Sequence, residues 1–141
     1  IIVTDTAVIA CLGASLIVEE KTPFITVDAG NCHTFAAAFD ESGNITAFFE
    51  HHTDSLSKES LKSYLNDLAR GNIDGDKIFN EGGHGAFIYK SINIGSAPVL
   101  VTGPNRSRFF REEHGVIFAD PKGDTMMTGP VGLLMQLGIK P

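Results

Sequence analysis

Residues 24–39 read FITVDAGNCHTFAAAF, and this stretch decides the fold. Two apolar runs flank a short polar turn here, and a third run follows after Asp40–Asn44, whose Asp, Ser, Gly and Asn residues favour a hairpin turn. The runs are Phe24–Val27, Thr34–Phe39 and Ile45–Glu50. Short apolar runs between turn residues are typical of strands, so the sequence predicts a three-stranded antiparallel meander over residues 24–52.

Helices and further strands are predicted on both sides of this meander. The 3, 4, 7 spacing of Leu61, Tyr64, Leu65 and Leu68 indicates a helix over Ser55–Arg70. Residues 72–94 are expected to be mostly loop. Strands are expected at Pro98–Thr102 and Val116–Ala119, and helices at Thr4–Glu20, at Gly103 to about His114 and at Met126–Leu137. The fold class is therefore α/β: a mixed five-stranded sheet, made of the meander plus two strand–helix units, with helices on both faces.

Composition narrows the function classes. The chain has 141 residues, 43% of them hydrophobic, and a net charge of −6, which suits one folded domain and argues against a nucleic-acid partner. The most apolar stretch, Ala7–Val18, is shorter than the roughly 20 residues of a membrane span, so no membrane partner and a cytoplasmic location are expected. The chain starts at Ile1 rather than Met, as if it were cut from a longer protein.

The turn from Asp28 to Thr34 has the chemistry of an anion site. Gly30 and Asn31 tolerate positive φ, so that successive backbone N–H groups can face one anion. Asp28 can hold Mg²⁺, directly or through water, and Thr34 can donate its hydroxyl. The alternative is a plain hairpin turn, which the pattern by itself favours.

Asp28-x-Gly30-x-x-x-Thr34 resembles the second phosphate motif of actin-like ATPases, sugar kinases and heat-shock chaperone ATPases. The element order over residues 24–137 is similar to one half of their two-domain, ribonuclease-H-like clamp. The resemblance implies that residues 1–141 form the C-terminal half, that 4–20 and 125–137 are connecting helices, and that the missing N-terminal half is a partner. It also implies Mg-ATP as the ligand, Asp28 as the catalytic residue, and a binding site of Asp28, Gly30, Asn31, Cys32, His33, Thr34, Gly103, Asn105 and Arg106.

One position departs from that pattern, because Gly103-Pro104 stands where the superfamily usually carries Gly-Gly. More narrowly, the chain resembles a prokaryotic family labelled as pyruvate formate-lyase activating enzymes. The resemblance lies in Val27–Thr34, Glu50–Thr53 and Thr102–Arg106. A radical glycyl activase needs three clustered cysteines to hold an iron–sulfur cluster, and this chain has only Cys11 and Cys32. The sequence therefore supports the fold but not that activity.

Other residues leave alternatives open. Glu50, His52 and His84 form a candidate metal site, although their spacing matches no strong metal signature. The glycines around His84 either let the backbone approach a ligand or form a mobile loop. Arg106, Arg108 and Arg111 either face phosphate or form ion pairs with Glu112 and Glu113. Cys32 is expected to have a packing or backbone role rather than a catalytic one.

The leading hypothesis is a nucleotide-phosphate-binding half of an actin-like or sugar-kinase-like protein, with little or no hydrolysis by this chain alone because it carries a single phosphate turn. The alternative is a non-catalytic ribonuclease-H-like binding or oligomerisation module, with a possible homodimer through the two apolar end helices. If the chain is an excised C-terminal half, those helices should show an exposed apolar patch or bury it by dimerising.

Overall fold

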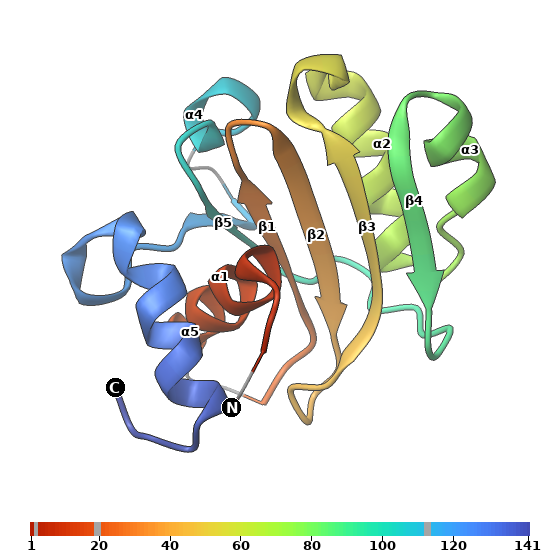
Figure 1. The fold of residues 1–141 in the computed structure, drawn as a ribbon. Coiled ribbons are helices and arrows are strands. Elements are labelled where there is room, and N and C mark those ends of the chain that lie inside the picture. Colours follow the sequence, from red (N-terminus) through yellow and green to blue (C-terminus); the bar gives the residue numbers. More distant parts are fainter. Residues whose placement is uncertain (2, 19–20, 112–113) are drawn as a thin grey trace.

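The computed structural model describes residues 1, 3–18, 21–111 and 114–141. These residues form one six-stranded sheet with strand order β4-β3-β2-β1-β5-β6 (Figure 1). The strands are β1 (Phe24–Ala29), β2 (His33–Phe39), β3 (Ile45–His52), β4 (Gly83–Ile88), β5 (Val99–Thr102) and β6 (Val116–Phe118). The α-helices are α1 (Thr6–Ala14), α2 (Lys58–Ala69), α3 (Gly75–Asn80), α4 (Arg106–Phe109) and α5 (Thr128–Gln136). Short 3₁₀ turns lie at Ser15–Ile17, Thr53–Ser55, Pro121–Gly123 and Thr125–Met127.

The pairing of the strands confirms the mixed, ribonuclease-H-like sheet. β1, β2 and β3 pair antiparallel in sequence order, and β5 and β6 then add parallel to β1 on its other side. The prediction of five strands was wrong by one, because residues 72–94 hold α3 and β4 rather than a loop. β4 pairs antiparallel with β3, and its glycines permit close packing, since a Cβ on Gly83 would lie 2.6 Å from the Ile78 side chain of α3.

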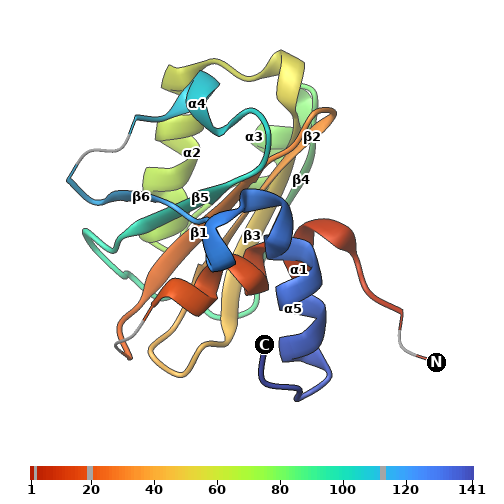
Figure 2. The same ribbon diagram turned by 90° about the vertical axis from the view of Figure 1, so that its left-hand side faces the viewer.

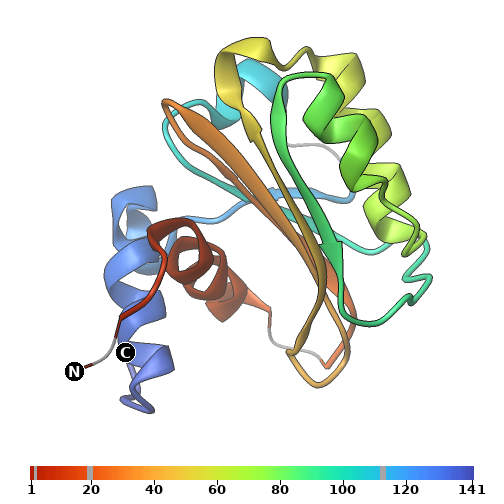
Figure 3. The same cartoon turned by 45° about the vertical axis from the view of Figure 1, so that its right-hand side comes forward.

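Helices cover both faces of the sheet, as predicted. α1 and α5 lie on one face and α2 and α3 on the other, as Figures 2 and 3 show. The alternation of β1 side chains separates two cores. Val27 joins a core with Leu61, Tyr64 and Leu68 of α2, whereas Phe24 joins Cys11 and Ala14 of α1.

α1 and α5 cross so closely that glycine is required at the contact. A Cβ on Gly13 would lie 1.8 Å from the backbone oxygen of Thr128, and one on Gly132 would lie 1.8 Å from that of Ile9. Gly13 of α1 and Gly132 of α5 thus allow the two helices to pack closely against each other within this chain. α1 ends at Ala14, earlier than predicted, and residues 19 and 20 of the predicted helix lie outside the described residues.

The remaining helices differ from prediction mainly at their ends. α2 begins after Ser57, whose hydroxyl accepts a hydrogen bond from the Ser60 N–H while the Ser60 side chain bonds back, which forms a capping box. α4 has only four residues, ending at Phe109 rather than near His114, and residues 112 and 113 lie outside the described part. None of the helices in the described ranges is long and apolar enough to cross a membrane.

Candidate functional site

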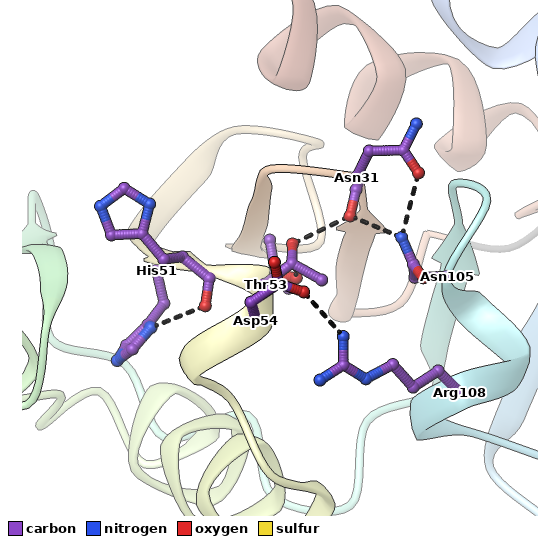
Figure 4. A network of polar contacts seen from close by, with 9 residues as sticks. Asn31, His51, Thr53, Asp54, Asn105 and Arg108 are labelled. Carbon is purple, nitrogen blue, oxygen red and sulfur yellow. Dashed lines mark hydrogen bonds and ion pairs between the residues drawn. The ribbon is translucent and has the colours of Figure 1, made fainter.

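Three loops meet beyond one end of the central strands and are joined through a single carbonyl group. The backbone oxygen of Gly30, in the β1–β2 turn, accepts hydrogen bonds of 2.9 Å from the Thr53 hydroxyl and from the Asn105 amide. The same Asn105 amide donates to Asn31 Oδ1 at 3.2 Å (Figure 4). The Asn105 backbone N–H donates to the Ala29 oxygen at 2.9 Å. The turn at residues 28–34 and the turn at 103–106 therefore lie side by side.

The Gly30 turn differs in conformation from the prediction. Gly30 is not among the glycines with positive φ, so that part of the prediction was wrong. Position 30 requires glycine for a steric reason instead, because a Cβ there would lie 2.6 Å from the His33 backbone oxygen. Within the described part of the chain, the backbone N–H groups of Asn31 and Cys32 donate to no protein acceptor. These two groups remain available to a ligand at the exposed tip.

Asp28 lies at the end of β1, opposite Thr102 of β5, on the sheet face that α1 covers. Burial, and then the negative charge of Asp5, raise the pKa of Asp28 from its ordinary 3.8 to about 6. Among the described residues, no side-chain donor or cation contacts its carboxylate. Gly103 approaches so closely that a Cβ there would lie 2.6 Å from Asp28 Oδ1. A half-buried carboxylate without a partner is suited to bind a cation.

The Thr34 hydroxyl and the Cys32 carbonyl are both bonded to Thr53 within the protein. The Thr34 side chain is fully buried, and its hydroxyl shares a 3.0 Å hydrogen bond with the Thr53 hydroxyl. The prediction that Thr34 donates to a phosphate is therefore wrong in this geometry, because the hydroxyl points into the protein. Cys32 is exposed, and its carbonyl accepts a 2.8 Å hydrogen bond from the Thr53 N–H, which is the predicted backbone role.

In the Gly103–Arg106 turn, Gly103 lies against β1 and Arg106 braces the turn from within. Gly103 has φ +90°, and a Cβ would also lie 2.5 Å from the Ala29 oxygen, so only glycine fits. Arg106 Nη1 donates to the Gly103 oxygen at 3.0 Å while the guanidinium lies over the Phe118 ring. Arg108 pairs with Asp54 at 3.3 Å (Figure 4), whereas the predicted partners Glu112 and Glu113 lie outside the described residues.

A second cluster lies beside the turn, where β2 begins, β3 ends and β4 begins. His51 and His52 face opposite sides of the sheet, as predicted: His51 is buried against Tyr64, and His52 is exposed. His33, His52 and His84 gather at the surface, with one ring nitrogen of each within 4.8 Å of those of the other two. Two of the three predicted ligands, His52 and His84, lie together in this cluster. The third member is His33 and not Glu50.

Glu50 instead lies next to that set, with Oε1 3.9 Å from His33 Nδ1. His33 is expected from the sequence in the phosphate-binding turn and not among the metal ligands. A signal was present, since His33 and His52 are the first and last residues of paired antiparallel strands and lie directly opposite each other.

Comparison with known proteins identifies the family to which the chain belongs. No curated protein matches the chain. Among solved structures, the ethanolamine utilization protein EutJ from Carboxydothermus hydrogenoformans is similar over 87% of this chain, with 17% identity and a TM-score of 0.40, and the chain spans 52% of the length of EutJ. A family model described as "Putative pyruvate format-lyase activating enzyme (DUF1786)" matches residues 1–108. That match takes in the Asp28 turn, the histidine cluster and the Gly103 turn, and the chain belongs to this family.

Proposed function

We propose that this chain is the phosphate-binding half of a nucleotide-binding protein and takes Mg-ATP at the joined turns of residues 28–34 and 103–106. The observation that carries the proposal is the unpartnered Asp28 carboxylate, which lies next to a tip with free backbone N–H groups. Such N–H groups suit phosphate oxygens, and a carboxylate suits the accompanying Mg²⁺. The Asp28-x-Gly30 resemblance to the actin-like superfamily adds to this reasoning.

The residues present fit a magnesium ion in one specific respect. Asp28 and Asp5 repel each other, so a cation near Asp28 relieves a repulsion that already exists in the protein. Bound Mg²⁺ neutralises phosphate charge. In this proposal Asp28 holds the ion directly or through water, the N–H groups of Asn31 and Cys32 donate to phosphate oxygens, and Asn105 fixes the turn that carries them.

The activity named in the family's description is not part of the proposal. Holding an iron–sulfur cluster with an open iron requires three clustered thiolates, and this chain has two cysteines. Cys11 is buried in α1, and Cys32 is exposed at the tip of the β1–β2 turn. We expect the chain alone to hydrolyse ATP slowly or not at all, because phosphoryl transfer requires charge stabilisation on both sides of the phosphate. Among the described residues, we assign phosphate contacts to one turn, residues 28–34.

The test is a thermal-shift and calorimetric titration with Mg-ATP, Mg-ADP, Mg²⁺ alone and ATP alone. Wild-type protein should be stabilised by the magnesium nucleotides, and Asp28→Asn should lose that response. Asp76→Asn is the matched control, because Asp76 is an exposed carboxylate on α3, remote from the turn. An unchanged affinity for Mg-ATP in Asp28→Asn would overturn the assignment, as would an equal loss in Asp76→Asn.

A second function, self-association through the end helices, is favoured by one observation. α5 and the residues beside it carry four exposed apolar side chains: Met126, Leu133, Leu137 and Ile139. Solvent-exposed apolar clusters of this kind mark interaction surfaces. In sedimentation experiments, wild-type protein should form dimers that Leu133→Lys dissociates. A monomeric wild-type protein at all concentrations would exclude this function.

A further inference from the structure

The histidine cluster lies outside the proposed nucleotide contacts except for His33, and it has its own chemistry. Its three imidazoles come from three different strands: His33 from β2, His52 from β3 and His84 from β4. The ring centroids are 4.8 Å apart for His33–His52, 4.9 Å for His33–His84 and 4.7 Å for His52–His84. Each ring thus contacts both of the others, and all three side chains are exposed.

The sheet holds these rings in place through its pairing. His33 lies directly opposite His52 in the β2–β3 ladder. A register shift between Glu50 and His51 brings the start of β4 alongside the end of β3, and Gly83 and Gly85 flank His84 without adding bulk. The three side chains therefore extend from the neighbouring ends of three paired strands, which limits the backbone ordering that a bound ligand would require.

We propose that His33, His52 and His84 bind one divalent transition-metal ion of the zinc class. Neutral imidazole is a ligand suited to Zn²⁺, Co²⁺ and Ni²⁺, and a three-histidine set leaves a coordination position open to water or another ligand. Tetrahedral coordination with metal–nitrogen bonds of about 2.0–2.1 Å places ligand nitrogens about 3.4 Å apart. Side-chain rotation of exposed rings closes the gap from 4.8 Å without a change in the backbone.

Glu50 has a supporting place in this site. Its Oε1 lies 3.9 Å from His33 Nδ1, which is too far for a hydrogen bond. A small rotation of either side chain would bring the two atoms within hydrogen-bond distance. A metal-bound histidine commonly donates its second ring N–H to a carboxylate, which fixes the ring and raises its basicity. Glu50 therefore acts on the metal through His33, and its replacement should weaken binding less than loss of a ligand.

The metal site and the nucleotide site are separable. Mg²⁺ prefers oxygen ligands, such as the Asp28 carboxylate, whereas the histidine cluster offers three nitrogens. Asp28→Asn should therefore leave transition-metal binding unchanged. Failure of the nucleotide proposal would leave the metal proposal standing, and the reverse also holds.

The experiment is a titration of untagged, chelator-treated protein with Co²⁺, followed by absorption, and with Zn²⁺ in competition with a chromophoric chelator. Wild-type protein should bind one equivalent, with a dissociation constant in the micromolar range or below. His33→Ala, His52→Ala and His84→Ala should each weaken binding at least tenfold, and Glu50→Gln should weaken it less. Circular dichroism checks that the variants fold, which their exposed positions favour.

His114→Ala is the matched control, because His114 is exposed and precedes β6 at the opposite edge of the sheet. It should bind metal as the wild type does. The proposal is overturned if wild-type protein is not close to saturated with one equivalent at about 100 μM free metal, because the dissociation constant would then be that of a weak surface site. It is also overturned if any one of the three histidine variants retains wild-type affinity, or if His114→Ala loses as much as they do.

Discussion

The α1–α5 crossing gives a stability prediction whose sign can be worked out from the structure. In Gly13→Ala the new methyl group would lie 1.8 Å from the Thr128 oxygen, whereas an ordinary contact begins at 3.4 Å. The helices must therefore separate by roughly 1.6 Å at this point. Overpacking costs about 1–3 kcal/mol, and a clash this short against backbone belongs at the upper end, about 3 kcal/mol, of which alanine returns about 1 kcal/mol through helix propensity. We expect a net loss of about 2 kcal/mol in the free energy of unfolding, or about 4–8 °C in Tm.

The assay is urea and thermal unfolding followed by far-ultraviolet circular dichroism. Gly129→Ala in α5 is the control, because nothing lies within 4 Å of a Cβ there. Its gain in helix propensity is reduced by the restriction that Pro130 places on the preceding residue, so its stability should change by less than about 1 kcal/mol. Wild-type stability in Gly13→Ala, or an equal loss in Gly129→Ala, would refute the reasoning. Gly132→Ala should cost as much as Gly13→Ala, and the double variant less than the sum, because one separation relieves both clashes.

Three further perturbations have expected outcomes. Because the folded protein raises the pKa of Asp28 from 3.8 to about 6, the folded state holds this proton more tightly, and stability falls by up to about 3 kcal/mol as pH rises from about 4 to 6. Asp28→Asn should therefore match wild type near pH 4 and exceed it at pH 7 in urea unfolding. Asn105→Ala removes the amide bond to Gly30 and should cost about 1 kcal/mol in the same assay, since Thr53 still donates to that carbonyl. Ser57→Ala removes the α2 cap and should also cost about 1 kcal/mol, measured as a fall in Tm.

Local sequence patterns were sufficient for most of the fold. The hairpin turns and the leucine spacing of α2 are short-range signals, and the structure contains both elements near the predicted bounds. β4 carried no such signal, because the glycines at 82, 83 and 85 disfavour a strand by propensity. It is a strand because β3 supplies a ladder partner and α3 packs on Gly83, which are contacts between distant segments.

The site shows the same division between local and long-range information. Asp28 and the Gly103 turn could be selected from residue chemistry, and the structure brings them together. The burial of Thr34 could not be predicted from the turn alone, because it depends on Thr53, 19 residues away. His33 could have been placed beside His52 from the β2–β3 hairpin, where the two residues lie opposite each other. The position of His84 beside them depends on the pairing of β4 with β3, which links distant segments.

Because the three histidines lie on three different strands, their proximity depends on the register of those strands. In a strand, a slip of one residue moves a side chain to the opposite face, so His84 meets His33 and His52 only when β4 is correctly aligned. The chain has no tryptophan with which to follow folding by fluorescence. A coloured ion such as Co²⁺ held by this triad would report optically on the alignment of β4 with β3 and β2.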